Sequence, residues 1–293
     1  MDDDDWLTGR FEVSRPRLRV MAYRMLGSLS DAEDAVQDAW LHAAGAHSGA
    51  VDNLEGWFTT IVARVCLDRL RSRRSRREEP LGAEETLAAE KAMAAGPEQE
   101  ALLADSVGLA LLVVLDTLAP AERVAFVLHD TFGLPFGEIA AITGRSAGAA
   151  RQLASRARRR VRGTAPVSGI RRARQREVAE AFLAASRGGD LGALLAVLDP
   201  EVVLHADAAA VPSGVAMTIR GAAAVASGAR AASGRSRYSG IALVNGTPGI
   251  VMAPRGRLIL VLAFIIGDGK ISRIDVIADP ARLEELDLAV LDY

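Results

Sequence analysis

The sequence predicts a multidomain protein in which two all-α helical modules, the second with a helix-turn-helix, precede an α+β domain with a curved antiparallel sheet. Apolar residues recur at helical spacing through the first half of the chain. A glycine turn then joins a short helical segment to a longer one that is rich in arginine. In the last third, strand-like runs alternate with glycine-containing turns, which is typical of antiparallel hairpins.

Composition narrows the class of protein. With 293 residues, the chain has room for two or three domains. Its start, MDDDDW, is acidic where a signal peptide is basic, and no apolar run reaches the roughly 18 residues of a membrane span, so we expect a cytoplasmic protein. The single cysteine, Cys66, excludes an internal disulfide, and we expect a packed core thiol rather than a redox switch.

Charge is segregated along the chain, although the net charge is only −2. Arginine-rich blocks lie at residues 64–77, 151–162 and 171–176, and an acidic stretch separates the first two. Local basic patches, rather than net charge, mark a nucleic-acid binder. These blocks are therefore the candidate nucleic-acid surfaces.

The first helical module extends over residues 11–77. Gly27 is expected to end one helix, and Ser30 to cap the next, whose acidic first turn suits the positive end of the helix dipole. After a polar loop at residues 45–53, residues 54–74 predict one long helix that carries the first basic block in its second half.

The second helical module follows a linker at residues 79–97 that is rich in charge, proline and glycine. Helices are expected over residues 98–118 and 120–131, since a proline suits the first position of a helix. A second linker, residues 164–170, separates this module from the last third of the chain.

Residues 136–162 carry the pattern of a helix-turn-helix. Gly144 supplies the positive φ that the turn needs, and Ser146 is a natural N-cap for a helix that continues to Arg162. In this motif the second helix lies in the DNA major groove. The alternative is a helical hairpin with a solvated charged face, but turn spacing, cap and charge placement together favour DNA binding.

The last third begins with helical patterns at residues 171–186 and 191–198. A strand at 202–206 and an alanine-rich helix at 221–232 follow, and a last short helix starts near Pro280. The remaining strand-like runs are residues 236–245, 249–253, 257–266 and 270–277.

Three linked segments resemble a known family. They read LGSLSDAEDAVQDAWLHA, NLEGWFTTIVARVCLDRLRSRRSR and LDTLAPAERVAFVLHDTFGLPFGEIAAITGRSAGAARQLASRARRRV. In order and spacing they resemble the extracytoplasmic-function (ECF) sigma factors of bacterial RNA polymerase. The last third is similar to SnoaL-like domains, which share the ketosteroid-isomerase cone, and the phrases RQLASRARRRV and DPARL resemble the subgroup of sigma factors fused to such a domain.

The resemblance implies a domain order. Sigma region 2, for core polymerase and the −10 promoter element, would occupy residues 1–78, and region 4, for the −35 element, residues 98–163. Linkers at 79–97 and 164–170 would join them to a SnoaL-like regulatory domain at 171–293. The implied function is an alternative sigma factor that directs promoter-specific transcription initiation, with its activity modulated by the fused domain.

The expected partners are core RNA polymerase and promoter DNA, with an intramolecular contact between the SnoaL-like domain and the sigma modules and no membrane. We expect no catalytic residue, cofactor or metal. Two alternatives stay open: a ketosteroid-isomerase-like enzyme tethered to DNA by the helical half, and a helix-turn-helix regulator that acts without polymerase. Binding to core polymerase distinguishes the sigma factor from both.

The resemblance places polymerase binding on an acidic helix face, since carboxylates suit arginine partners on the polymerase. Taken alone, this face would be a solvated acidic surface. The residues are Asp31, Glu33, Asp34, Gln37 and Asp38.

The −10 candidates combine polar groups, an aromatic ring and cations, which melted single-stranded DNA requires. Trp57 is either a core anchor or a stacking surface for a base, and the arginines from Arg71 to Arg77 are expected to contact phosphates. The full set is Asn53, Trp57, Arg64, Asp68 and Arg69.

The −35 candidates lie at the exposed start of the recognition helix, because arginine pairs with guanine and glutamine with adenine. Ala150 and Leu153 are expected to face inward, and most arginines from Arg156 onward to bind phosphate. The set is Arg145, Ser146, Ala149, Arg151, Gln152 and Arg156.

The SnoaL-like domain holds a possible polar pocket. His205 and Asp207 share parity on one strand and so can face the same side. No acid–base dyad is defined by spacing, so regulation is favoured over catalysis, with ligand sensing as a related alternative. The candidate lining residues are His205, Asp207, Tyr238 and Asp275.

Overall fold

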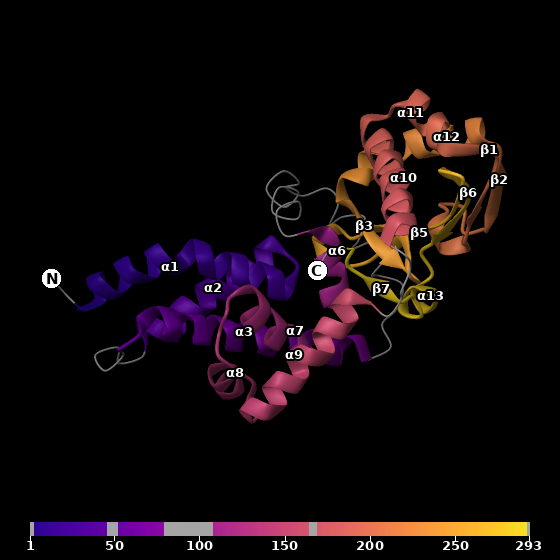
Figure 1. Ribbon diagram of the computed structural model, residues 1–293. Helices are drawn as coiled ribbons and strands as arrows, with labels where there is room; N and C mark the ends of the chain where they lie inside the picture. Colours follow the sequence, from indigo (N-terminus) through magenta and orange to yellow (C-terminus); the bar gives the residue numbers. More distant parts are fainter. Residues whose placement is uncertain (1–2, 46–51, 79–107, 164–168, 292–293) are drawn as a thin grey trace. The chain divides into compact units, whose positions relative to one another are not determined.

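The computed structural model describes residues 3–45, 52–78, 108–163 and 169–291 (Figure 1). These residues form two compact units. The boundary passes through α6 (Leu109–Asp116) after Val114 and through α9 (Ala147–Arg162) after Arg158. No helix within the described ranges is long and apolar enough to cross a membrane.

The first unit begins with three mutually packed helices, α1 (Asp3–Leu26), α2 (Leu29–Ala44) and α3 (Leu54–Glu78). Phe11 joins them, because its ring lies 5.0 Å from that of Trp40 and 5.1 Å from that of Phe58.

The N-cap of α2 differs from the expectation. The prediction of Ser30 was wrong by two residues, since the Oγ of Ser28 accepts the backbone N–H of Asp31 at 3.4 Å. The helix therefore includes Ser30, whose hydroxyl lies 3.0 Å from that of Ser28.

The same unit continues with α7 (Pro120–Phe126), the π-helix η2 (Val127–Thr131), α8 (Phe136–Thr143) and most of α9. The predicted helix at 120–131 thus widens into a π-turn after Phe126. The helix predicted at 98–118 is observed as α6, and its residues before 108 lie outside the described part of the chain.

The core of the first unit joins α3 to α7 and α8. Cys66 of α3 is fully buried, and burial raises the pKa of its thiol to about 12 despite the opposing charges of Arg69, Arg123 and Arg73. A thiol with so high a pKa carries no thiolate at neutral pH. The expectation of a packed core thiol is confirmed.

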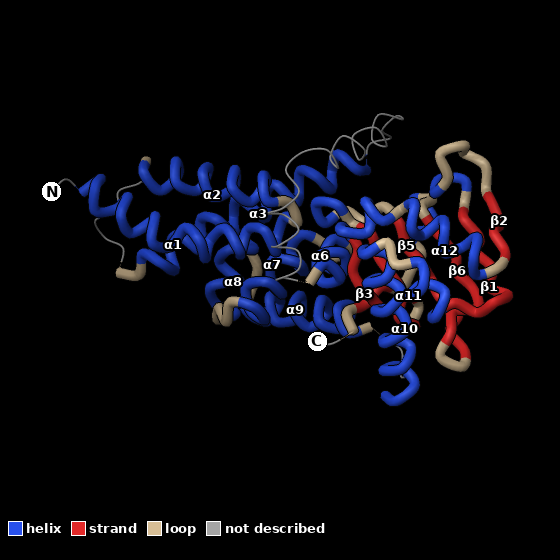
Figure 2. The backbone as a smooth tube through the Cα atoms, turned by 90° about the horizontal axis from the view of Figure 1, so that it is seen from above, coloured by secondary structure: helices blue, strands red, loops and turns tan. Residues whose placement is uncertain are grey.

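The C-terminal domain packs α10 (Gly169–Gly188), α11 (Leu191–Val197) and α12 (Ala222–Ala231) on one face of a seven-stranded sheet (Figure 2). The strand order is β2-β1-β6-β5-β4-β3-β7. Phe182 of α10 meets Phe264 of the sheet with ring centroids 5.4 Å apart. The strands are β1 (Leu198–Ala206), β2 (Met217–Arg220), β3 (Ser239–Val244), β4 (Thr247–Met252), β5 (Leu260–Gly267), β6 (Lys270–Ile277) and β7 (Leu288–Ala289).

The sheet is mixed rather than purely antiparallel. Strand β1 pairs with β6 in parallel, and all other neighbours are antiparallel. A parallel partner requires a long crossover, and here residues 207–269 supply it. The short strands β2 and β7 were not predicted, because four and two residues give too little alternation to detect.

The end of α9 is tied to the C-terminal end of the chain within the second unit. The backbone N–H of Val290 donates to the carbonyl of Val161 at 2.8 Å. A Cβ at Gly163, whose φ is +68°, would lie only 2.6 Å from the Cβ of Ala289. The segment after β7 thus caps a helix end whose carbonyls would otherwise lack donors.

Candidate nucleic-acid interface

The helix-turn-helix has the turn that the sequence predicted. Gly144 ends α8 in the left-handed region, with φ +69° and ψ +35°. The Oγ of Ser146 accepts the backbone N–H of Ala149 at 3.1 Å and so begins α9. Ala150 and Leu153 are buried, as expected, which directs the opposite face of α9 outward.

Five of the six −35 candidates are exposed side chains, and four of these five form no ion pair with a described side chain, while Ala149 is half-buried. Arg151 extends over the ring of Phe136, with its guanidinium carbon 5.2 Å from the centroid. This contact holds the side chain at the start of the recognition helix without neutralising its charge. The four exposed candidates without such an ion pair are Arg145, Ser146, Arg151 and Gln152.

The sixth candidate, Arg156, is engaged within the protein. Its Nε lies 2.7 Å from a carboxylate oxygen of Glu122 on α7. Arg158, two residues further along and on the opposite side of α9, forms an ion pair with Asp130 of η2. Both carboxylates are largely buried, so these arginines fasten α9 to the helices behind it.

In the region 2 module, the −10 candidates occupy α3 and the residue before it. The Oδ1 of Asn53 accepts the backbone N–H of Gly56 at 3.0 Å, which makes Asn53 a cap of α3. Trp57 is half-buried with its ring 5.5 Å from Phe58, so both of its predicted roles stay open. Asp68 pairs with Arg71 at 3.2 Å on the exposed surface.

Two of the basic residues of α3 clamp α2. The Nη2 of Arg69 lies 2.5 Å from the Oδ2 of Asp38, and the same distance separates Arg73 from Asp31. Arg73 also donates to the carbonyl of Leu26 at 3.0 Å. The residues expected to bind DNA and polymerase are therefore partners of each other in the free protein.

The polar residues of α2 thus fall into two groups: those that form ion pairs with neighbouring helices and those that do not. Asp31 and Asp38 face α3, and Glu33 lies 3.6 Å from Arg19 of α1. Asp34 and Gln37 are exposed and have no ion pair or hydrogen bond with a described side chain. These two residues are the best placed to meet a partner protein.

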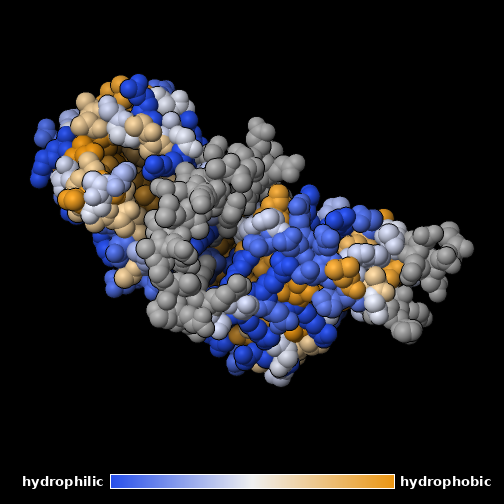
Figure 3. Space-filling model, turned by 180° about the vertical axis from the view of Figure 1, so that it is seen from behind, coloured by the Kyte–Doolittle hydropathy of each residue, from blue (hydrophilic) through white to orange (hydrophobic). Residues whose placement is uncertain are grey.

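Hydrophilic side chains dominate the visible face of the helical part (Figure 3).

Arg64 connects α3 to the helix-turn-helix. Its Nη2 donates to the carbonyl of Ala141 in α8 at 3.2 Å. Phe132, in the turn before α8, lies near two arginines of α1, with the guanidinium carbons of Arg17 and Arg24 6.0 and 5.9 Å from its ring centroid. Within the first unit, the exposed −10 candidate Arg64 thus already contacts α8.

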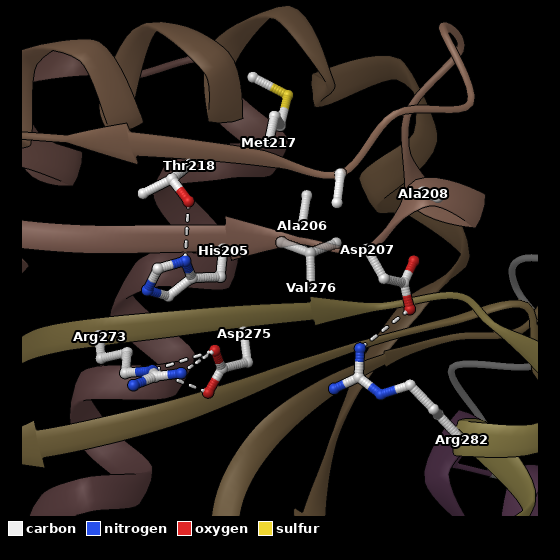
Figure 4. Close-up of a pocket in the computed structure, with 11 residues that line it drawn as sticks. His205, Ala206, Asp207, Ala208, Met217, Thr218, Arg273, Asp275, Val276 and Arg282 are labelled. Carbon is white, nitrogen blue, oxygen red and sulfur yellow. Dashed lines mark hydrogen bonds and ion pairs between the residues drawn. The ribbon is translucent and has the colours of Figure 1, made fainter.

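The polar pocket of the C-terminal domain is a cavity of about 340 Å³ that brings together His205, Asp207 and Asp275 (Figure 4). Tyr238 is buried elsewhere and does not line it. His205 and Asp275 are opposite each other across β1 and β6, while their neighbours Leu204 and Ile274 pack into the core on the other face of the sheet.

The charged groups of this cavity are already paired. Arg273 holds Asp275 with contacts of 2.9 and 3.0 Å, and the Nδ1 of His205 lies 2.9 Å from the Oγ1 of Thr218. The Nη1 of Arg282 lies 3.4 Å from Asp207. This arrangement leaves the cavity without an unengaged carboxylate to act as a base.

Asp207 has a structural role. It accepts the backbone N–H groups of Ala210, Ala278 and Asp279, each at 3.0 Å. Burial alone would raise the pKa of this carboxyl, but these hydrogen bonds and the charge of Arg282 outweigh it and lower the pKa below its ordinary value. Asp207 thus fastens the end of β1 to the turn that follows β6.

Several residues of the interface were not found from the sequence. Glu122, Asp130 and Phe136 determine which arginines of α9 are engaged and which are displayed. No local pattern marks them, because they act on residues 15 to 34 positions away along the chain. Arg123 was also missed: it is 2% exposed and donates to Asp116 at 3.0 Å.

Comparison with known proteins agrees with this arrangement. Residues 11–76 match the family model for sigma-70 region 2, and residues 108–161 match the model for sigma-70, region 4. The first match contains α2 and nearly all of α3, and the second contains α8 and nearly all of α9.

Relatives align along nearly the whole chain. The chain is 36% identical to the probable ECF RNA polymerase sigma factor SigI of Mycobacterium tuberculosis (strain ATCC 25618 / H37Rv) over 98% of each protein. It is 36% identical to the ECF RNA polymerase sigma factor SigJ of the same strain, over 93% of this chain and 91% of the relative. A crystal structure of M. tuberculosis SigJ aligns with 94% of this chain and 98% of its own, at 30% identity and a TM-score of 0.42. Full-length relatives at this identity show that the chain belongs to the ECF RNA polymerase sigma factors, which are transcription initiation factors rather than enzymes.

Proposed function

We propose that this ECF sigma factor binds core RNA polymerase, directs it to one class of promoters in the cytoplasm, and is modulated by its C-terminal domain. One observation carries the proposal. A helix-turn-helix that displays Arg145, Arg151 and Gln152 lies on the same chain as a region 2 module with an exposed acidic helix. The proposed modules are region 2 (residues 1–78), region 4 (98–163) and a SnoaL-like domain (171–293).

Each DNA element has its own set of residues in this proposal. Arg151 and Gln152 read base edges of the −35 element, with Arg145 and Ser146 at the turn, because guanidinium and amide groups form paired hydrogen bonds with guanine and adenine. Arg156 belongs to the set only if it leaves Glu122. Asn53, Trp57, Arg64, Asp68 and Arg69 take the melted −10 strand.

Polymerase binding falls to α2. Asp34 and Gln37 dock first, because they are exposed and no described side chain engages them, and Glu33 is held by a long ion pair. Asp31 and Asp38 contribute when Arg73 and Arg69 exchange partners. Charge-assisted hydrogen bonds to arginines of the polymerase supply the specificity.

Modulation rests on the junction between α9 and the end of the chain. Support comes from the hydrogen bond of Val290 to Val161 and from the fit of Ala289 against Gly163. A change in the C-terminal domain would reach the recognition helix through this cap. Such a coupling shifts the population of a DNA-competent helix rather than creating it.

Transcription in vitro tests the proposal, with core polymerase and a library of genomic promoters. We expect the full chain to bind core polymerase and to select a promoter class, and Val290→Pro, which lacks the capping N–H, to change the activity at those promoters. Val290→Ala keeps the N–H and is the matched control. A chain that binds DNA but not core polymerase would contradict the proposal and support a polymerase-independent regulator.

A truncation after Gly169 gives a second measure of modulation. We expect the shortened protein to retain core polymerase binding and to differ from the full chain in promoter activity. Equal promoter activity of both proteins would argue against regulation by the C-terminal domain. Turnover of a small molecule that is lost on changing both His205 and Asp207 would instead favour the enzyme alternative.

A further inference from the structure

One tract of the sequence has an unusual distribution of charge. Residues 144–176 contain 11 arginines and no aspartate or glutamate. The tract begins at the turn of the helix-turn-helix, continues through α9 and ends in the second turn of α10. The −35 proposal accounts for its beginning and leaves the part in α10 without a role.

The structure separates the engaged arginines of this tract from the displayed ones. Arg156, Arg158 and Arg176 pair with Glu122, Asp130 and Glu180. Beyond Arg145 and Arg151 at the start of the tract, the displayed arginines are exposed and form no ion pair or hydrogen bond with a side chain in the described ranges; they are Arg159, Arg160 and Arg162 in α9 and Arg171 and Arg174 in α10.

The first turns of α10 do not serve the core of their own domain. Residues 169–171 are all exposed, as are Ala173 and Arg174, and packing against the core starts only with Val178 and Ala179. The helix end that begins at Gly169 stands clear of the sheet (Figure 2). About two turns of helix thus display Arg171 and Arg174 on their exposed side, whereas Arg172 and Arg176 are half-buried, and Glu177 follows as an exposed carboxylate.

The end of the recognition helix belongs to the same compact unit as α10. Residues from Arg159 onward fall in that unit, and Val290 fastens the carbonyl of Val161 to it. The displayed arginines at the end of α9 and those of α10 therefore belong to one compact unit.

We propose that the first turns of α10 form an additional DNA-contact surface, which binds phosphates of the promoter duplex upstream of the −35 element. This inference rests on the proposed function as a sigma factor. Arg171 and Arg174 make the contact as unpaired guanidinium groups, which suit phosphate oxygens and add affinity that depends on salt but not on sequence.

Duplex phosphate is the occupant that the local chemistry favours. Residues 169–176 contain no aromatic side chain for stacking on unpaired bases, which single-stranded DNA would require. Because residues 144–176 contain no acidic residue, the arginines of α10 continue the basic tract of the recognition helix, and we expect both to bind the same DNA molecule. The contact lies upstream because the region 2 module engages the downstream side, where the −10 element is.

The test compares two promoter duplexes bound by the holoenzyme of this chain and core polymerase. One duplex ends at the upstream edge of the −35 element, and the other extends about 20 base pairs further, or two helical turns. We expect the wild-type holoenzyme to bind the longer duplex roughly 3- to 10-fold more tightly at about 0.1 M salt, with a salt slope steeper by about 1 to 2, as expected for one or two more phosphate contacts.

The double variant Arg171→Gln/Arg174→Gln should lose this gain, and Arg171→Lys/Arg174→Lys should keep most of it. The matched control is Arg220→Gln/Arg230→Gln, which removes two exposed arginines of the same domain outside the tract and should keep the full gain. A hydroxyl-radical footprint should shrink upstream of the −35 element in the glutamine variant of α10 alone.

Three outcomes would overturn the inference. In the first, the glutamine variant of α10 still binds the longer duplex more tightly than the shorter one, by the same factor as wild type. In the second, the control variant loses as much of this gain in affinity as the α10 variant does. In the third, the α10 variant loses as much affinity for the short duplex as for the long one. Each of them can occur while transcription from the −35 and −10 elements is intact, so the proposed sigma function would stand. Failure of the wild-type chain to bind core polymerase would instead reject the proposed function itself.

Discussion

The arginines of α3 and those of α9 look alike in the sequence and behave differently in the structure. In α3, Arg69 and Arg73 reach back to Asp38 and Asp31 of the neighbouring helix. In the helix-turn-helix, Arg145 in the turn and Arg151 in the first turns of α9 remain displayed. A basic block therefore does not identify a DNA contact by itself, because the fold decides which arginines meet a carboxylate.

The contrast also exists within α9. Its first turns display charge, whereas Arg156 and Arg158 are fastened to the helices behind them. Paired arginines fix where the recognition helix lies, and displayed ones are available to read DNA. Substitutions that separate stability from promoter binding can test this division.

The largest effect on stability is expected for the most deeply paired arginine. Arg123→Ala should lower the free energy of unfolding by about 3 kcal/mol, because it opens a void and leaves Asp116 without its buried partner. Arg160→Ala, at an exposed site, should stay within about 0.5 kcal/mol. Denaturant unfolding followed by far-UV circular dichroism measures both, and equal midpoints for the two variants would refute the division.

The half-buried carboxylate of Asp207 extends the comparison to a charged group whose partners are backbone N–H groups. Asp207→Asn should lower the free energy of unfolding by about 2 kcal/mol, because the amide nitrogen would face backbone N–H groups that now donate hydrogen bonds to the carboxylate. Arg282→Ala should change it by less than about 1 kcal/mol, since Arg282 is exposed.

The Asp207 effect should depend on pH. A folded-state pKa below the ordinary value of 3.8 means that the charged carboxylate stabilises the domain fully above that value. The stabilisation is lost as the pH falls through the lower folded-state pKa. Unfolding curves of wild type and Asp207→Asn should therefore converge in strong acid, and a constant difference down to the lowest pH would refute the charge-based role.

Arg151 tests the arginines that are exposed and available to bind DNA. Arg151→Ala should reduce specific promoter binding by the holoenzyme about 10-fold, within the roughly 1–3 kcal/mol of a paired contact to a base. Arg159→Ala should weaken binding to all sequences alike. Electrophoretic competition between cognate and scrambled −35 duplexes separates the two, and an equal loss of core polymerase binding in Arg151→Ala would reject its assignment to DNA.

Local signals predicted the parts of the fold that local chemistry determines. Gly144 and Ser146 specify the turn and cap of the helix-turn-helix, and the buried spacing of Ala150 and Leu153 fixes the outward face of α9. The N-cap of α2 was assigned to the wrong serine, because Ser28 and Ser30 both carry a hydroxyl group that can cap a helix. The extended backbone of Ser28, with φ −129° and ψ 134°, makes Ser28 the cap.

Long-range pairing could not be predicted in the same way. The partners of Arg69 and Arg156 lie 31 and 34 residues away, and no periodicity connects them. The parallel pairing of β1 with β6 likewise depends on a crossover rather than on either strand's own pattern. His205 and Asp275 line one pocket in the structure, and their engagement by Thr218 and Arg273 was not predicted.

The smallest predicted effect concerns the clamp between α2 and α3. Both side chains are partly exposed, at 27% for Arg69 and 46% for Asp38, so solvent weakens their attraction. A double-mutant cycle with Arg69→Ala and Asp38→Ala should give a coupling of about 0.5 kcal/mol in the free protein. The same cycle measured on binding to core polymerase shows whether Asp38 exchanges partners. A coupling that persists unchanged in the holoenzyme would mean that Asp38 stays on Arg69 and that polymerase docking depends on Asp34 and Gln37 instead.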